Sequence, residues 1–300
     1  MQTFFEPRTD SGSISTSSPA KIMKLAAILI AAVFSAGFTS LERLAIPSAK
    51  LEDAHWKQSG SASLDLTGPY QAFLDRYVRT DANGINRVAY GKVTRADKDS
   101  LNATIASMSK ATVTSASRTE QLAFWVNLYN AKTISLVLDN YPVKSIREIK
   151  FGAFSSGPWG KKVLTVEGRP LSLNDIEHKI VRPLFRDRRV HYVLNCAALG
   201  CPNLEKKAYF GKTISAAMDR AARAYVNHPR AVSFSADGGL TVSKIYGWFR
   251  EDFGGGAAGI LAELKKYAKP DLARKLANVK RINAFTYDWA LNDQRTAGES

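Results

Sequence analysis

Apolar residues recur at intervals of three or four along much of the chain, a spacing that predicts amphipathic helices. The longest such pattern begins near Arg118 and should end before Pro142, because proline cannot continue a helix. Shorter patterns of the same kind predict helices over residues 70–78, 98–111, 171–185, 213–228, 244–256 and 261–278. Segments rich in valine, threonine and aromatic residues predict strands over 85–90, 162–166, 189–198, 231–243 (a pair joined by a turn) and 282–293.

Helices and short strands therefore alternate irregularly, which predicts an α+β fold. A single globular domain is expected over residues 64–294. Residues 41–63 are polar and rich in small side chains, as is typical of a linker, and residues 295–300 form a short tail. Residues 1–40 contain a polar leader followed by an apolar segment.

That apolar segment has the pattern of a secretory signal peptide. Lys21 and Lys24 precede an apolar run over residues 25–38, which is too short for a stable membrane-spanning helix. Small residues offer a cleavage site, so a signal peptide is expected at about Lys21–Gly37, with an uncleaved anchor as the alternative. In either case we expect the rest of the chain to be periplasmic or secreted, and to meet a membrane through this segment alone.

The composition fits a basic globular protein. The 300 residues include 45% hydrophobic residues and carry a formal net charge of +15. This hydrophobic content suffices for a good-sized core without cysteine cross-links. The basic residues are spread along the chain and form no arginine-rich run interleaved with aromatics, so nucleic-acid binding is not expected. The charge instead favours anionic surfaces or acidic substrates.

The chain has two cysteines, Cys196 and Cys201, five positions apart. A structural zinc site needs four ligands, and no Cys/His cluster supplies them, so no metal and no other cofactor is expected. In an oxidising compartment the pair can close as a disulfide. Thiol redox chemistry is a weaker interpretation, because CAALGC lacks the CxxC spacing. The last interpretation is that Cys196, at the end of a predicted central strand, is an accessible nucleophile.

A cysteine nucleophile needs a base within about 3 Å, or one water molecule away. Two of the four histidines lie in the expected linker or in a predicted surface loop: His55 and His228. His191 lies five residues before Cys196 on the predicted strand, so its side chain would point to the opposite face. This leaves His178, on the preceding helix, as the predicted base. Glu177 is the nearest residue that can orient its ring.

Other polar residues offer support for such a site. Asn127 and Asn130 lie three positions apart in the long apolar helix, where they either tie down the backbone of a neighbouring loop or act in the reaction. Asp175 is an alternative to Glu177, and it also completes a capping box with Ser172. On that helix His178 faces away from the apolar stripe, a position that is usually solvated.

Four blocks of the sequence resemble the family catalogued as domain of unknown function 547. In chain order they are AFWVNLYNAKTISLVLDNYPVKSIREI, LSLNDIEHKIVRPLFRDRRVHYVLNCAALGCPNL, SKIYGWFREDFGG and YDWALN, within about residues 119–292. Members of this family are similar in fold to papain-like cysteine hydrolases, including phytochelatin-synthase-like enzymes that act on glutathione. The resemblance implies helices packed around a short, mostly antiparallel sheet, with a Cys-His-acid site.

The family pattern carries over onto Cys196, His178 and Glu177 as the catalytic residues. In plant-type members serine commonly stands at the position of Cys201, which implies that Cys201 is dispensable for chemistry.

We therefore expect an exported thiol-dependent hydrolase that cleaves amide or peptide bonds of small peptides, either glutathione-like or from the envelope. Cys196 would attack the carbonyl, His178 would move the proton and Glu177 would orient the imidazole. The backbone amides of residues 195–198 would hold the oxyanion, and Asn195 is, like Asn127 and Asn130, a candidate supporting residue. The alternative is a non-catalytic envelope module that binds a peptide, with Cys196 and Cys201 closed as a disulfide.

Overall fold

The computed structural model describes residues 46–64, 67–152 and 157–294. The predicted signal peptide and the C-terminal tail lie outside these residues. Within the described ranges, no helix combines the length and the apolar character needed to cross a bilayer.

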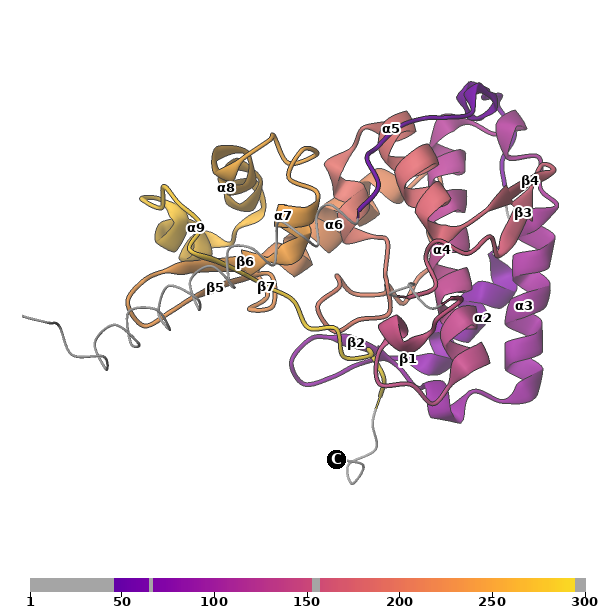
Figure 1. Cartoon of the computed structure of the whole chain (residues 1–300), viewed down its shortest axis with the longest axis horizontal. Helices are drawn as coiled ribbons and strands as arrows, with labels where there is room; N and C mark the ends of the chain where they lie inside the picture. Colours follow the sequence, from indigo (N-terminus) through magenta and orange to yellow (C-terminus); the bar gives the residue numbers. More distant parts are fainter. Residues whose placement is uncertain (1–45, 65–66, 153–156, 295–300) are drawn as a thin grey trace, which may run out of the picture.

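Three helices pack together at one end of the molecule (Figure 1). They are α2 (Gly68–Tyr77), α3 (Arg95–Ser109) and α4 (Arg118–Asn140), with the hairpin β1 (Val78–Thr80) and β2 (Asn86–Val88) between α2 and α3. The long helix α4 begins and ends as its sequence predicts. Ser117 caps it by accepting a hydrogen bond from the backbone N–H of Glu120, one of the first-turn donors that lack a partner inside the helix.

The other end of the molecule holds a three-stranded sheet and the last helices (Figure 1). The strands are ordered β5 (Val232–Phe234), β6 (Leu240–Ser243) and β7 (Ala284–Thr286). β6 pairs antiparallel with β5 and parallel with β7. The helices of this half are α6 (Ile214–Val226), α7 (Lys244–Trp248), α8 (Ala257–Tyr267) and α9 (Pro270–Leu276).

The part of the chain between α4 and α6 carries the predicted catalytic residues. In chain order it contains β3 (Leu164–Val166), β4 (Arg169–Leu171), the π-helical stretch η5 (Asp175–Val181), α5 (Arg182–Phe185) and the 3-10 helix η6 (Arg188–Tyr192). The predicted capping box is present. The Asp175 N–H donates to Ser172 Oγ at 3.1 Å, and the Ser172 N–H donates to Asp175 Oδ2 at 2.7 Å.

Four further 3-10 helices occur among the described residues: η1 (Ala54–Lys57), η2 (Tyr90–Lys92), η3 (Val113–Ser115) and η4 (Ile146–Glu148). The α+β class is confirmed, but the strands are distributed differently from the expectation. In the described part of the chain they form three small sheets of two, two and three strands, instead of one mostly antiparallel sheet.

The predicted strand over residues 189–198 is wrong. Asp187 accepts a hydrogen bond from the Arg189 N–H at 2.9 Å and begins η6, after which the chain continues without regular structure. The segment is apolar on both faces because the core surrounds it, as the burial of the following residues shows: Val190, Tyr192, Val193 and Leu194. A fully buried turn has the same apolar pattern as a buried central strand.

The predicted helix over residues 244–256 is also shorter than expected. α7 ends at Trp248, and the chain then runs through turns to Gly254 and Gly255, which both have positive φ angles. Asp252 therefore lies on a turn and not on a helix.

The N-terminal segment, residues 46–57, packs against the domain although it was expected to be part of a linker. Trp56 is buried and makes an edge-to-face contact with Trp125 on α4, with ring centroids 5.1 Å apart. The Lys50 N–H donates to the His178 carbonyl at 3.0 Å. This segment helps to bury His178, which is only 4% exposed. Its position on the helix had predicted a solvated side chain.

Candidate active site

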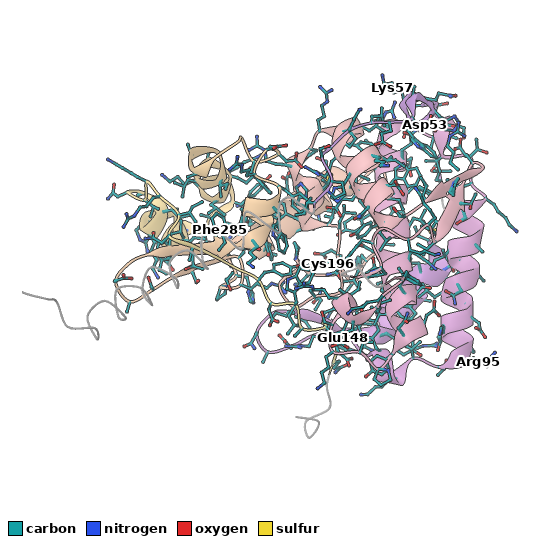
Figure 2. All side chains as sticks on the ribbon, viewed as in Figure 1. Asp53, Lys57, Arg95, Glu148, Cys196 and Phe285 are labelled. Atoms are coloured by element: carbon teal, nitrogen blue, oxygen red, sulfur yellow. A yellow bond between two sulfur atoms is a disulfide. The ribbon has the colours of Figure 1, made fainter. Side chains whose placement is uncertain are left out.

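A cavity of about 620 Å³ lies between the two ends of the molecule, and Figure 2 places Cys196 near the middle of the structure. Five residues that the sequence analysis considered for the site line this cavity: Glu177, His178, His191, Cys196 and Cys201. Its volume falls within the range of roughly 300–1,000 Å³ that is usual for small-molecule sites.

The two cysteines are joined by a disulfide. The Cys196 N–H donates to Cys201 Sγ at 3.0 Å. The Tyr287 hydroxyl lies 3.0 Å from Cys196 Sγ and 3.1 Å from Cys201 Sγ. Because a thiolate is the nucleophilic form of cysteine, attack by Cys196 requires reduction of this bond first.

Polar side chains hold the loop that carries the disulfide. Asn130 on α4 accepts a hydrogen bond from the Asn195 N–H at 2.8 Å and donates to the Val193 carbonyl at 2.9 Å. The Asn195 side chain spans the loop, because its Nδ2 donates to the Pro202 carbonyl at 2.8 Å and its Oδ1 accepts from the Ala197 N–H at 2.9 Å. These bonds fix the loop relative to α4.

The other predicted supporting groups also have structural roles. Asn127 donates to the Tyr209 carbonyl at 2.8 Å and accepts from the Tyr209 N–H at 2.9 Å, so it ties down a neighbouring backbone. The backbone N–H groups of Asn195, Cys196 and Ala197 all have acceptors in the disulfide-bonded state. In this state they are not free to hold an oxyanion.

The ring of His178 is already engaged through Nδ1. Arg182 Nη1 lies 2.9 Å from His178 Nδ1. Because a guanidinium group donates and does not accept, Nδ1 is the acceptor and the neutral ring carries its proton on Nε2. Burial, reinforced by the charge of Arg182, lowers the pKa of His178 to about 3. At neutral pH His178 is therefore uncharged and presents a hydrogen-bond donor at Nε2.

His191 lines the cavity although the predicted strand excluded it. Its Nε2 lies 2.7 Å from Asp252 Oδ2, and its ring stacks on Phe249 with centroids 4.0 Å apart. Burial opposes ionisation of Asp252, but hydrogen bonds from His191 and Arg182 outweigh it and lower the pKa of this carboxyl.

An ionised Asp252 accepts, so His191 donates its Nε2 proton to it and leaves Nδ1 unprotonated. Burial lowers the pKa of His191 and favours this neutral ring. A carboxylate that holds one nitrogen of an imidazole, with the other nitrogen free, is the arrangement of base and orienting group in Cys-His and Ser-His sites.

Glu177 lies beside His191 and not against His178. Its Oε1 is 4.0 Å from His191 Nδ1, and its Oε2 accepts from the Tyr129 hydroxyl at 3.2 Å. Burial raises the pKa of the Glu177 carboxyl. The alternative orienting residue, Asp175, is engaged by the capping box and by Lys162 Nζ at 2.6 Å. Among the described residues, no group of three or more His, Cys, Asp and Glu side chains is arranged to hold a metal ion.

Aromatic side chains form one wall of the cavity. The Tyr287 ring centroid lies 4.8 Å from that of Trp248 and 4.7 Å from that of Trp289. Trp159 continues the wall at 5.8 Å from Trp289, and the Arg147 guanidinium lies 5.1 Å from the Trp289 ring. Such a wall suits apolar or flat groups, and Arg147 adds a positive charge beside it.

The sequence did not reveal His191, Asp252 or the aromatic wall as parts of the site. Asp252 is 61 residues away from His191 in the chain, and the tertiary structure alone joins them. The blocks SKIYGWFREDFGG and YDWALN contain Trp248, Asp252 and Tyr287. These blocks supported the family resemblance, but the sequence analysis gave their residues no role in the site.

Comparison with known proteins gives a family for part of the chain. Residues 113–226 match the model of the family described as Protein of unknown function, DUF547. This range includes α4, η5, η6 and both cysteines. No curated protein and no solved structure matches the chain. Residues 113–226 of the chain are therefore similar to the DUF547 family.

Proposed function

We propose that this protein is a thiol-dependent hydrolase of small peptides or amides, and that Cys196 is its nucleophile once the disulfide is reduced. The observation that carries the proposal is that one cavity brings Cys196 together with Glu177, His178 and His191. A distant relationship to papain-like hydrolases would account for this set of residues.

An external thiol would first open the disulfide, leaving two cysteine thiols and the oxidised form of the reductant. Cys196 would then lose its proton to His191 Nδ1, while Asp252 holds Nε2 and stabilises the imidazolium. We assign this role to His191 because Nδ1 of His178 already accepts a hydrogen bond from Arg182. The thiolate attacks the carbonyl carbon of the substrate, and the neutral His178 donates from Nε2 to the developing oxyanion.

The intermediate then collapses as the bond to the amine breaks. His191 returns its proton to the leaving amine, and the acyl group stays on Cys196 as a thioester. A water molecule gives a proton to His191 and attacks the thioester. The carboxylic acid leaves, and the proton on His191 restores the Cys196 thiol.

The aromatic wall defines the substrate class of this proposal. Trp248, Tyr287 and Trp289 favour a peptide or amide with a large apolar or aromatic side chain. Arg147 would attract a carboxylate on the same substrate. Glutathione has no such apolar side chain, so we propose it as a poorer substrate than an aromatic dipeptide.

The test measures product formation by mass spectrometry with reduced and non-reduced protein, using aromatic dipeptides, their acyl amides and glutathione. We expect turnover after reduction, its loss in Cys196→Ala, and a decrease of roughly a hundredfold or more in His191→Ala. Cys201→Ser should turn over without added reductant, because no disulfide can form. Unchanged turnover in Cys196→Ala would eliminate the proposal.

A non-catalytic peptide-binding module is the second candidate, because Cys196 and Cys201 are bonded to each other in the described structure. Non-reducing mass spectrometry of protein isolated from its cells, together with calorimetric titration of peptides, tests this candidate. A bridge that withstands mild reductant, with peptide binding but no turnover, would support it. Turnover that appears on reduction would rule it out.

A further inference from the structure

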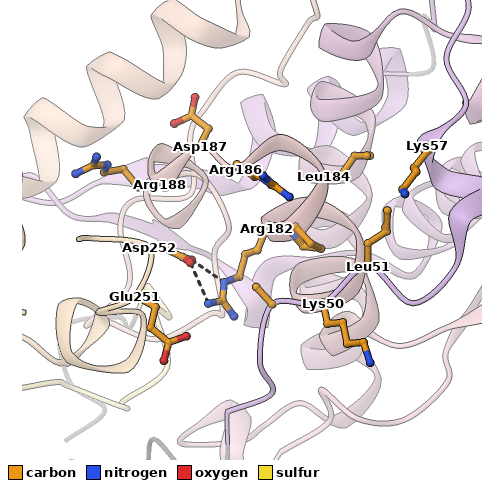
Figure 3. A pocket seen from close by; sticks show the side chains of 12 residues that line it. Lys50, Leu51, Lys57, Arg182, Leu184, Arg186, Asp187, Arg188, Glu251 and Asp252 are labelled. Carbon is orange, nitrogen blue, oxygen red and sulfur yellow. Dashed lines mark hydrogen bonds and ion pairs between the residues drawn. The ribbon is translucent and has the colours of Figure 1, made fainter. Parts of the chain in front are cut away.

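A second cavity, of about 750 Å³, borders the Arg182–Asp252 ion pair, and no step of the proposed reaction takes place inside it (Figure 3). We propose that it binds a multiply charged anion, one that bears phosphate groups or several carboxylates. This proposal is independent of the chemistry at Cys196.

Positive side chains outnumber negative ones around this cavity. Among the described residues, its cationic lining side chains are Lys50, Lys57, Arg182, Arg186 and Arg188. Its carboxylates are Asp187, Glu251 and Asp252. The lining therefore has more positive than negative charge at neutral pH.

Two of the carboxylates are neutralised by specific partners. Asp252 receives hydrogen bonds from Arg182 Nε at 2.7 Å and Arg182 Nη2 at 3.2 Å, and it lies 2.7 Å from His191 Nε2. Asp187 receives a hydrogen bond from Nη2 of Arg189 at 2.6 Å, and Arg189 does not line the cavity. Neither carboxylate is left to balance the remaining cations.

Three of the cations, in contrast, have no ion-pair or hydrogen-bond partner for their charged groups among the described residues. They are Lys50, Lys57 and Arg186, which Figure 3 draws around the same cavity as Arg182. Like charges gathered around one concave surface raise the local positive potential, and an anion that enters relieves their repulsion. Arg188 is partly engaged, because its Nη1 lies 3.5 Å from Glu263 Oε2.

The backbone that carries these cations is anchored. Lys50 donates its N–H to the His178 carbonyl at 3.0 Å, and Lys57 directly follows the buried Trp56. Arg186 ends α5 and donates its N–H to the Arg182 carbonyl at 3.1 Å. A ligand would therefore bind between two fixed segments, and the ordering cost would fall mainly on the side chains.

The lining also includes the apolar side chains of Leu51 and Leu184. They would contact the uncharged part of an organic anion. The same chemistry is found in a free polyphosphate or organic phosphate and in the phosphorylated headgroup of a lipid, so the experiment separates these sources.

The test uses the non-reduced, full-length protein and needs no catalytic turnover. Calorimetric titration with inorganic tripolyphosphate measures the free anion. Co-flotation with vesicles of phosphatidylcholine, with and without phosphatidylglycerol, measures the lipid surface. We expect binding in at least one arm, weakened by salt, and a loss of roughly tenfold or more in Lys50→Ala/Lys57→Ala/Arg186→Ala.

The matched control is Lys212→Ala/Lys280→Ala/Arg281→Ala, which removes the same charge from exposed positions that do not line the cavity. Its binding should stay within about twofold of the wild-type value. Absence of binding in both arms, or an equal loss in the two triple variants, would overturn the proposal. Circular dichroism of each variant shows whether it is folded.

Discussion

At the scale of single residues, two carboxyl groups near the cavity have pKa values displaced in opposite directions. Burial raises the pKa of Glu177. For Asp252, burial also opposes ionisation, but the hydrogen bonds from His191 and Arg182 prevail and lower the pKa. The stability of the protein should therefore depend on pH in opposite ways through these two groups.

Glu177→Gln tests the raised pKa. A carboxyl whose pKa is higher in the folded state contributes stability below its unfolded pKa, near 4.5, and this contribution is lost as the pH rises through the folded value. The wild type should therefore lose stability relative to Glu177→Gln as the pH rises from about 4.5 toward neutrality. Urea unfolding across this range measures the difference. Glu148→Gln, at an exposed position, is the control. If the stability difference between wild type and Glu177→Gln depends on pH no more than that for the control, the account is contradicted.

Asp252→Asn tests the lowered pKa. The variant leaves the buried Arg182 without its ionised partner, which should cost about 3 kcal/mol at neutral pH. A depressed pKa contributes stability above the unfolded value of 3.8, and this contribution is lost as the pH falls below it. The deficit of the variant should therefore shrink in acid. Asp139→Asn, which breaks a surface ion pair with Lys98, should cost less than about 1 kcal/mol, and an equal cost in both variants would contradict the assignment.

At the scale of elements, α4 supports the disulfide loop through Asn130 and a different backbone segment through Asn127. Both amides are buried and both bind backbone groups. The two positions therefore form a matched pair, in which one variant perturbs the candidate site and the other does not.

Asn130→Leu and Asn127→Leu should each cost about 1–3 kcal/mol, because each leaves buried backbone groups without partners. In the reduced protein, however, Asn130→Leu alone should change the rate at which Cys196 is alkylated. Thermal unfolding and mass-spectrometric labelling give the two readouts. Equal labelling rates in both variants would show that Asn130 does not position the loop.

The elements also show how far the sequence predicts this fold. α4 was predicted at both ends, because Ser117 caps its first turn and Pro142 stops it. The segment 189–198 was not, because residues buried on all sides look alike in a strand and in a 3-10 helix. That single error removed His191 from the candidate site, since its exclusion assumed the alternation of a strand.

The predicted site residues Cys196, His178 and Glu177 do line one cavity. The hydrogen bonds of His178 and His191 could not be predicted from the sequence, because they involve Arg182 and Asp252, which lie 70 residues apart in the chain. Local sequence patterns do not indicate which distant side chain will form a hydrogen bond with a histidine ring nitrogen.

At the scale of the whole molecule, the N-terminal segment of residues 46–57 joins the two cavities. Pro47 lines the candidate active site, and its carbonyl accepts from Arg182 Nη1 at 3.3 Å. Lys50 and Lys57 line the second cavity. The buried Trp56 anchors the segment to α4 through Trp125.

Trp56→Ala should release this segment. Loss of a buried tryptophan costs about 3–5 kcal/mol, so the midpoint of thermal unfolding should fall and trypsin should cleave first after Lys50 or Lys57. Trp248→Ala, in the aromatic wall, is the control: it should weaken binding of aromatic peptides without exposing these two sites. Limited proteolysis followed by mass spectrometry measures the order of cleavage. Cleavage elsewhere in the chain first would contradict the anchoring role.

The central claim is that His191 activates Cys196 inside the shared cavity. The most direct measurement is the alkylation rate of Cys196 by iodoacetamide as a function of pH, in Cys201→Ser protein under reducing conditions. We predict a midpoint below the ordinary thiol pKa of about 8.5, which returns to that value when His191→Ala is added. A midpoint at or above about 8.5 that His191→Ala does not move would contradict the claim.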